Sequence, residues 1–271
     1  MKDKHPEADR NFDDLVERFQ RNIYDSMKGR LRLAILRRDF AEAIPAAPLR
    51  VLDIGAGQGQ WALEMLAAGH RVLLTDISQT MLEASRQQIT ESDLSDVAKQ
   101  HARWLHCGAQ ELADRLDETF DLIVCHAVME WLEQPFLLLK WIEPLLAPGG
   151  WVSLIFYNRD GLIFKNLLRA NYAKVESRDF RGSRGSLTPL NPLAVDEVLA
   201  WTEAADFELV CRSGIRVFHD YVLDKQNYQK DPESVERLEL AYSRVPPFRD
   251  LGRYQHFLLR KSNTPKILRK K

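Results

Sequence analysis

The fold is decided by residues 49–59, which read Leu49-Arg50-Val51-Leu52-Asp53-Ile54-Gly55-Ala56-Gly57-Gln58-Gly59. The first six residues form a short apolar run that is typical of a buried strand, and the glycines allow the tight turn that leads into a helix. The next strand-like run, 71–76, ends in Asp76, 21 residues after Gly55. A carboxylate there suits hydrogen bonding to ribose hydroxyls. The stretch therefore predicts a nucleotide-binding strand–turn–helix unit.

Strand-like and helix-like segments alternate after this unit. Further strands are predicted at 102–106, 120–125, 151–157, 208–217 and 254–260, with helices at 79–89, 136–146, 195–205 and 234–242. Near-continuous apolar strands that alternate with helices are typical of a parallel sheet covered on both faces. We therefore expect an α/β fold with a Rossmann-like sheet of seven strands.

The residues before this unit are predicted to be helical. Apolar residues recur at helical spacing from Asp13 to Phe40, which indicates one or two amphipathic helices with Gly29 as a candidate break. We expect an N-terminal helical cap at 1–48 and a main domain at 49–262. That domain carries a basic insert at 158–192, after the fifth strand, and a basic tail follows at 263–271.

Composition limits the function. The chain has 271 residues, 45% of them hydrophobic and 28% charged, with a formal net charge of −1. No apolar run approaches the roughly 20 residues that span a bilayer, and the charged first ten residues contain no signal peptide, so we expect a cytoplasmic protein that is not membrane-bound. The three cysteines and seven histidines are scattered, so no metal site is expected. No obligate protein partner is evident.

The glycine spacing argues against a dinucleotide. The fingerprint for dinucleotides is G-x-G-x-x-G, whereas the third glycine comes one residue early here, at Gly59. Asp53 also puts a negative charge where a pyrophosphate would lie, and this acid could instead receive the ammonium of an amino acid. A ligand with a ribose and an amino-acid end therefore fits better than NAD.

Three features of the sequence resemble a known superfamily. Residues 51–59 resemble the first motif of the seven-strand S-adenosylmethionine-dependent methyltransferases, Asp76 resembles their ribose-binding acid, and residues 146–150 resemble the turn before their fifth strand. This resemblance covers Leu49 to Tyr157 and does not identify the methyl acceptor.

Seven further motifs resemble one bacterial family, the tRNA carboxymethoxyuridine carboxyl methyltransferases. They are Asn11-Phe12-Asp13-Asp14, Arg21-Asn22-Ile23-Tyr24, Lys28-Gly29-Arg30-Leu31-Arg32, His126-Ala127-Val128-Met129-Glu130-Trp131, Phe156-Tyr157-Asn158, Arg216-Val217-Phe218-His219-Asp220-Tyr221 and Leu251-Gly252-Arg253-Tyr254. The family esterifies the carboxylate of a carboxymethoxy group on the wobble uridine of tRNA. The chain departs from it in the insert, where arginines are spread from Arg178 to Arg184 instead of forming a compact lysine run.

The resemblance implies S-adenosylmethionine as cofactor. Its binding site would consist of Arg32, Asp53, Gly55, Ala56, Gly57, Gly59, Asp76, Ile77, Ala109, Gln110 and His126. Within it, Arg32 would bind the cofactor's carboxylate, Gly55 and Ala56 its amino-acid end, and Asp76 its ribose. Ala109 and Gln110 would lie beside the adenine, and His126 would close the pocket.

The resemblance also implies the tRNA anticodon stem-loop as partner. A modest polar contact with the substrate carboxylate is expected from Tyr157, Arg216, His219 or Tyr221. Arg178, Arg181 and Arg184 would contact the RNA, with Tyr172 and Phe180 as stacking aromatics. A carboxylate is already ionised at pH 7, so no catalytic base is expected.

Other function classes remain open. A methyltransferase of a small carboxylic acid or quinone precursor would more often carry an apolar lid where this chain has its basic insert. A catalytically silent cofactor-binding scaffold has no need of both the glycine turn and Asp76. An NAD-dependent oxidoreductase is disfavoured by the glycine spacing.

Overall fold

The computed structural model describes residues 26–180, 189 and 191–262. The predicted basic tail, the motifs before Ser26, and Arg181 and Arg184 of the insert lie outside the described residues. Within the described part of the chain, no helix is long and apolar enough to cross a membrane.

One seven-stranded sheet organises the molecule, in the order β3-β2-β1-β4-β5-β7-β6. Neighbouring strands are parallel except that β7 runs antiparallel to both β5 and β6. The predicted α/β class is confirmed. The strands are β1 Arg50–Ile54, β2 Arg71–Asp76, β3 Ala102–His106, β4 Phe120–His126, β5 Leu146–Tyr157, β6 Phe207–Ile215 and β7 Tyr254–Lys261.

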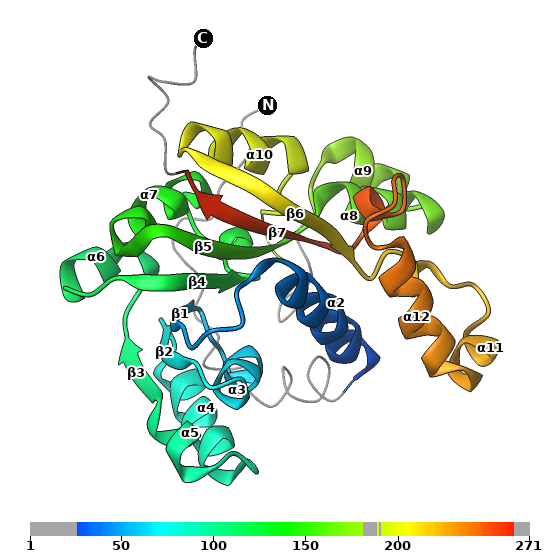
Figure 1. The fold of residues 1–271 in the computed structure, drawn as a ribbon. Helices are drawn as coiled ribbons and strands as arrows, with labels where there is room; N and C mark the ends of the chain where they lie inside the picture. Colours follow the sequence, from blue (N-terminus) through cyan, green and yellow to red (C-terminus); the bar gives the residue numbers. More distant parts are fainter. Residues whose placement is uncertain (1–25, 181–188, 190, 263–271) are drawn as a thin grey trace.

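Helices cover both faces of the sheet (Figure 1). One apolar core lies under α2, α3 and α4, and the other lies under α6, α7 and α10. The α-helices are α2 Met27–Ala43, α3 Gln60–Ala67, α4 Gln79–Glu91, α5 Asp96–Gln100, α6 Leu112–Arg115, α7 Leu138–Ile142, α8 Arg159–Leu168, α9 Tyr172–Ser177, α10 Val195–Ala204, α11 Lys225–Lys230 and α12 Pro232–Tyr242. Short 3-10 turns are η2 Ala109–Glu111, η3 Met129–Trp131, η4 Pro135–Leu137, η5 Glu143–Leu145, η6 His219–Tyr221 and η7 Arg249–Leu251.

Helix α2 belongs to the core of the sheet. Its residues Ile35, Leu36 and Phe40 are buried in the same cluster as residues of β1 and α3, and the helix packs against β6 and α12. The predicted break at Gly29 is wrong, because Gly29 is a buried residue inside α2. Packing of the apolar face outweighs the roughly 1 kcal/mol that a glycine costs within a helix.

The predicted helix at 136–146 is interrupted. The structure has only five α-helical residues there, in α7, between the 3-10 turns η4 and η5. Pro144 explains the interruption, since it has no N–H to donate to the carbonyl of Lys140. The Pro148-Gly149-Gly150 turn leaves the ladder of β5, because Phe120 pairs with Leu146 while Leu122 already pairs with Trp151.

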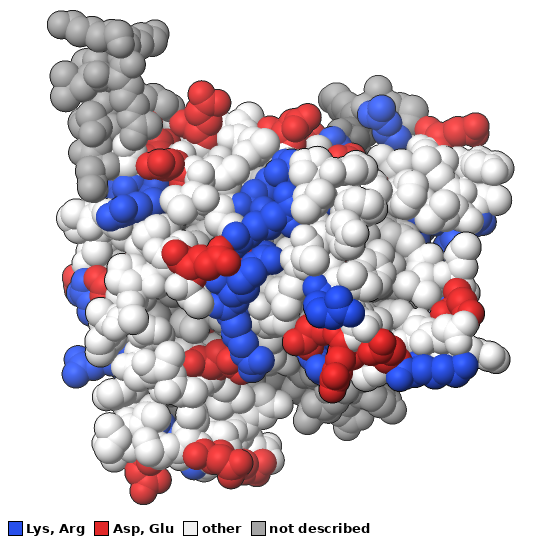
Figure 2. All heavy atoms as spheres, turned by 45° about the vertical axis from the view of Figure 1, so that its right-hand side comes forward, with Lys and Arg blue, Asp and Glu red and all other residues white. Residues whose placement is uncertain are grey.

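One face of the molecule carries a band of basic side chains. On the face that Figure 2 shows, Lys and Arg side chains form a band that runs from top to bottom through the middle, with groups of Asp and Glu side chains on either side of it.

Candidate cofactor and substrate site

The turn between β1 and α3 carries the predicted glycines. Gly55, Gly57 and Gly59 all have positive φ, and that of Gly55 is +65°. A Cβ on Gly55 would lie 2.3 Å from Cγ2 of Val128, which follows β4. Two conditions therefore require glycine at position 55, the left-handed backbone and the close approach of Val128.

Asp76 ties this turn to the end of β2. Its Oδ2 accepts a hydrogen bond from the backbone N–H of Gly57 at 2.9 Å, and its Oδ1 accepts one from the N–H of Ser78 at 2.8 Å. These bonds hold the carboxylate at the edge of the sheet, beside the glycine turn. Ile77 follows Asp76 and is half-buried.

The predicted adenine contacts lie at the same edge. The N–H of Cys107 donates to the carbonyl of Asp76 at 3.2 Å, which joins the ends of β2 and β3. Turn η2 begins two residues later with Ala109, which is buried, followed by Gln110, which is exposed. The structure thus brings Ala109 and Gln110 to the edge that carries Asp76.

Arg32, Asp53 and His126 meet where α2 crosses the ends of β1 and β4. Nη2 of Arg32 lies 3.5 Å from Nδ1 of His126. Burial raises the pKa of Asp53 to about 7. The charge of Asp76 contributes to this rise, and the charge of Arg32 opposes it. Burial, followed by the charges of Arg32 and His256, holds the pKa of His126 well below its usual value. A cation beside a buried acid suits a zwitterionic amino-acid end, with its carboxylate at Arg32 and its ammonium at Asp53.

Glu130 is a buried acid that sequence reasoning missed. It is 1% exposed on turn η3, and burial raises its pKa to about 8, although backbone N–H groups of Glu130 and Tyr157 and the charge of Arg32 oppose the rise. A signal existed, since an acid stands between the apolar Met129 and Trp131 four residues after β4.

Two buried polar atoms at this site indicate that it accepts a ligand. Among the residues that the structure describes, neither Nε of Arg32 nor Oε2 of Glu130 has a hydrogen-bond partner. Buried polar atoms almost always have one. The site therefore fits a ligand that brings hydrogen-bonding groups of its own, as the amino-acid end of S-adenosylmethionine would.

A second charged cluster adjoins the first through Tyr157, the last residue of β5. Asp220 accepts from Arg216 at 2.8 Å and from Arg253 at 2.7 Å, and Arg253 also donates to the hydroxyl of Tyr157 at 2.9 Å. The sequence predicts Tyr157 and Arg216 as substrate contacts. It indicates Arg253 only as part of the motif at 251–254. We call Lys28, Lys165, Arg216 and Arg253 the cationic cluster.

The cationic cluster carries more positive charge than Asp220 can balance. Burial lowers the pKa of Lys165 to about 8, and the charge of Arg253 lowers it further while that of Asp220 raises it. Burial and the charge of Arg216 likewise lower the pKa of Lys28. Within the described residues, Nε of Arg216 is buried without a hydrogen-bond partner. Such a cluster is arranged to receive an anion.

His219 and Tyr221 lie in turn η6 beside this cluster and contact other parts of the protein. The hydroxyl of Tyr221 lies 2.9 Å from the carbonyl of Gly161 and 2.7 Å from that of Leu251. Nδ1 of His219 contacts the hydroxyl of Tyr228, and burial lowers the pKa of His219 to about 4. These contacts hold the turn in place, and substrate binding by either residue stays a prediction.

The described part of the insert forms α8 and α9. Arg178 ends α9 in a left-handed conformation and is exposed, as an RNA-contacting residue requires. Phe180 is only 5% exposed and packs against Tyr157 and Leu162, so the expectation that it stacks on a base is wrong. Tyr172 is 59% exposed and is free to stack.

Comparison with known proteins extends the likeness beyond this site. A family model described as a methyltransferase domain matches residues 52–154. The chain is 40% identical over 257 residues to the tRNA 5-carboxymethoxyuridine methyltransferase of Escherichia coli O157:H7, a match that covers 93% of this chain and 97% of that one. It is 32% identical over 111 residues to the ubiquinone biosynthesis O-methyltransferase of Aromatoleum aromaticum, which covers 41% of this chain and 45% of that one.

Solved structures share the fold. The magnesium protoporphyrin IX methyltransferase of Synechocystis PCC 6803, solved with bound SAH, has a TM-score of 0.59 at 13% identity, covering 93% of this chain and 96% of that one. At that identity the likeness is one of fold.

Proposed function

Because the chain belongs to the family of the tRNA 5-carboxymethoxyuridine methyltransferases, we propose that it methylates the carboxylate of 5-carboxymethoxyuridine at the wobble position of tRNA, with S-adenosylmethionine as donor. The product is the methyl ester. The reaction takes place in the cytoplasm, where the anticodon stem-loop of tRNA is the partner.

One observation carries this proposal, namely the extent of the similarity. The match to the methyltransferase family model ends at residue 154, whereas the tRNA-modifying relative matches 93% of the chain. That match therefore extends past residue 154 into the part of the chain that carries the second charged cluster. The ubiquinone-related enzyme matches less than half of the chain, so a small-molecule acceptor has weaker support.

The cofactor site is assigned by the fit of its charges. S-adenosylmethionine supplies a methyl group on a positively charged sulfur, which a carboxylate can attack directly. In our proposal Arg32 binds the cofactor's carboxylate, Asp53 its ammonium and Asp76 its ribose. Gly55, Ala56, Gly57, Gly59 and Ile77 line its amino-acid and ribose parts, Ala109 and Gln110 lie beside its adenine, and His126 closes the pocket.

The cationic cluster is proposed to bind the substrate carboxylate. Methyl transfer cancels the charge of that carboxylate, so a tight bidentate arginine would stabilise the ground state more than the transition state. Arg216 and Arg253 already share Asp220, which tempers their attraction for a second anion. Catalysis then depends on holding the reacting atoms about 3–3.5 Å apart and in line, and no general base is required.

The RNA is proposed to lie over the insert. Arg178, Arg181 and Arg184 would contact phosphates, and Tyr172 would stack on an unpaired base. The support is the exposure of Arg178 and Tyr172.

The function is tested with purified protein and two tRNA substrates. We expect transfer of a labelled methyl group to tRNA that carries 5-carboxymethoxyuridine, and none to the same tRNA with unmodified uridine at that position. Mass analysis of the digested tRNA should show the methyl ester at the wobble nucleoside. Labelling of a free small carboxylic acid but not of tRNA would overturn the proposal in favour of a small-molecule enzyme.

Replacement of Lys165 by Gln is expected to raise the KM for tRNA about tenfold and leave kcat nearly unchanged. The reason is that Lys165 contributes to anion binding in ground state and transition state alike. The matched control is Lys140→Gln. Lys140 is exposed and lies on α7, which packs on the sheet face opposite to α2. Initial-rate kinetics check the result, and equal KM values for the two variants would contradict the role of Lys165.

The affinity for S-adenosylhomocysteine is expected to rise with pH and to level off above pH 7. Asp53, with a pKa of about 7, attracts the ligand's ammonium only when ionised, so affinity should fall by up to about tenfold per pH unit below pH 7. Calorimetry from pH 5.5 to 8.5 measures this slope. Asp53→Asn should abolish this slope, and Asp160→Asn, which removes a half-buried acid outside the cofactor site, should retain it. A flat wild-type profile would rule out the assignment.

A further inference from the structure

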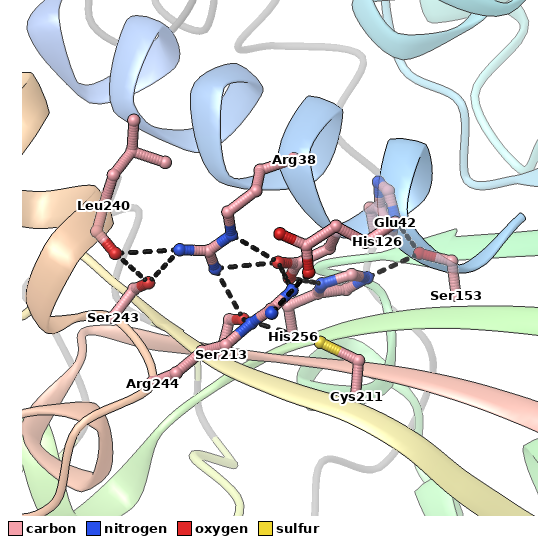
Figure 3. A network of polar contacts seen from close by, with 11 residues as sticks. Arg38, Glu42, His126, Ser153, Cys211, Ser213, Leu240, Ser243, Arg244 and His256 are labelled. Carbon is pink, nitrogen blue, oxygen red and sulfur yellow. Dashed lines mark hydrogen bonds and ion pairs between the residues drawn. The ribbon is translucent and has the colours of Figure 1, made fainter.

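A chain of buried polar groups runs beneath α2, from Asp39 of this helix to His126 of β4 (Figure 3). Nδ1 of His256 lies 2.7 Å from Oδ2 of Asp39, and Nε2 of His256 lies 3.0 Å from Oγ of Ser153. Oγ of Ser153 lies 2.7 Å from Nε2 of His126. We call Asp39, His256, Ser153 and His126 the relay. All four side chains are buried, and the first three are fully so.

The strand register places the relay on one face of the sheet. His126 of β4 and His256 of β7 both pair with Ile155 of β5, and Ser153 lies two residues before Ile155, so its side chain points to the same face as that of Ile155. Helix α2 covers this face and carries both Asp39 and Arg32. These residues are seven positions apart, which is close to two helical turns, so they share one side of α2.

Asp39 fixes the direction of the first hydrogen bond. Arg38 and Arg244 donate to its Oδ1 at 2.7 and 2.6 Å. Burial alone would raise the pKa of Asp39, but the hydrogen bond and charge of His256, together with the charge of Arg38, hold it well below the usual range. The carboxylate is therefore ionised at neutral pH and can only accept, so Nδ1 of His256 must carry a proton.

Counting donors then determines the rest of the relay. With neutral His256, its bare Nε2 accepts from the hydroxyl of Ser153, and Oγ of Ser153 accepts from Nε2–H of His126. His126 is left with a bare Nδ1 facing Nη2 of Arg32, a donor 3.5 Å away. With doubly protonated His256, the bond to Asp39 keeps its direction but the two bonds of Ser153 reverse, so that Nδ1–H of neutral His126 faces the N–H groups of Arg32. Only the first arrangement gives each contact one donor and one acceptor.

We propose that Asp39, His256 and Ser153 are positioning residues that hold His126 in its Nε2–H tautomer, so that the bare Nδ1 orients Arg32 toward the carboxylate of the cofactor. The identity of the ligand group, a cofactor carboxylate, rests on the proposed function. The tautomer of His126 does not depend on that function. Orientation by Nδ1 engages one of the five N–H donors of Arg32. Nε of Arg32, which is buried and has no hydrogen-bond partner among the described residues, stays available for a ligand.

The tautomer is measured directly in the protein without ligand. Nitrogen NMR of chain labelled with ¹⁵N in its histidines distinguishes a protonated ring nitrogen from a bare one, and a His126→Gln variant assigns the signals. We expect His126 to be protonated at Nε2 and bare at Nδ1. In Ser153→Ala, His126 loses its acceptor and the population of the Nδ1–H form should rise. A wild-type His126 protonated at Nδ1 would overturn the proposal.

Ligand binding gives the second readout. Ser153→Ala is expected to weaken S-adenosylhomocysteine binding about tenfold, the loss of one well-placed polar contact. Binding of methylthioadenosine, which has no amino-acid end, should not change. The matched control is Ser243→Ala, which removes another fully buried serine hydroxyl of the same network, one that accepts from Arg38 at 2.8 Å but lies outside the relay.

The outcomes separate the two proposals. Equal weakening for both ligands, or equal effects of the two serine variants, would show a general packing defect and overturn the positioning role. A wild-type protein with the Nε2–H tautomer and selective loss in Ser153→Ala, but no methylation of tRNA, would uphold the relay while the proposed tRNA substrate fails.

Discussion

A Gly55→Ala variant is expected to lose about 2–6 kcal/mol of unfolding free energy and to bind the cofactor about 100-fold more weakly. The left-handed backbone costs an alanine about 1–3 kcal/mol, and forcing Cβ against Val128 costs about 1–3 kcal/mol more. The clash arises because the added Cβ would lie 2.3 Å from Cγ2 of Val128. Denaturant unfolding and calorimetry with S-adenosylhomocysteine measure the two losses.

Gly69 supplies the matched control, since it also has a positive φ, of +85°, but an added Cβ would meet no atom within 4 Å. Gly69→Ala should therefore show only the backbone cost of about 1–3 kcal/mol and bind the cofactor normally. Trimming Val128 to Ala in the Gly55→Ala background should restore the steric part. Equal losses in the Gly55 and Gly69 variants would contradict the steric argument.

An Asp39→Asn variant is expected to lose about 3–5 kcal/mol, because it leaves Arg38 and Arg244 without their buried partner. The pKa of Asp39 is depressed in the folded protein. The charge of Asp39 therefore stabilises the folded protein fully above the pKa of an aspartate in the unfolded chain, about 4. This stabilisation is lost as the pH falls below that value. The difference in unfolding free energy between wild type and variant should be largest above about pH 5 and shrink toward pH 2.

Glu42→Gln is the control for this second variant. Glu42 also accepts from Arg244, at 2.5 Å, but its side chain is 53% exposed, so its removal should cost no more than about 1 kcal/mol. Urea unfolding from pH 2 to pH 7 gives both profiles. A loss in Asp39→Asn that does not vary with pH would refute the charge-based explanation.

The candidate site residues at the ends of β1, β2 and β4 could be predicted from local sequence. Asp53, Gly55, Asp76 and His126 lie at or just past the ends of β1, β2 and β4, and the ends of neighbouring parallel strands meet at one edge of a sheet. Spacing along the chain was therefore enough to place them. Gly29 and Phe180 were misjudged because tertiary packing, which local patterns do not contain, decides their environment.

The remaining site residues depend on contacts between distant segments. Arg253 and His256 enter the site because β7 inserts antiparallel between β5 and β6, and an apolar run at 254–260 does not reveal where its strand will lie. Lys165 lies on α8 and comes near Arg216 and Arg253 only through the tertiary fold. In the sequence, Asp39 looks like an ordinary solvent-exposed acid on an amphipathic helix. Only the structure shows that it is buried against His256.

The position of β7 has a consequence for synthesis of the protein. Strand β6 has β7 as its sheet neighbour, so residues 207–215 have no ladder to join until 254–261 have left the ribosome. His256 arrives with this last strand, and the Asp39–His256–Ser153 connection cannot form before it. A growing chain therefore contains the complete glycine turn and Asp76 before it contains the strand that, in our proposal, helps to orient Arg32.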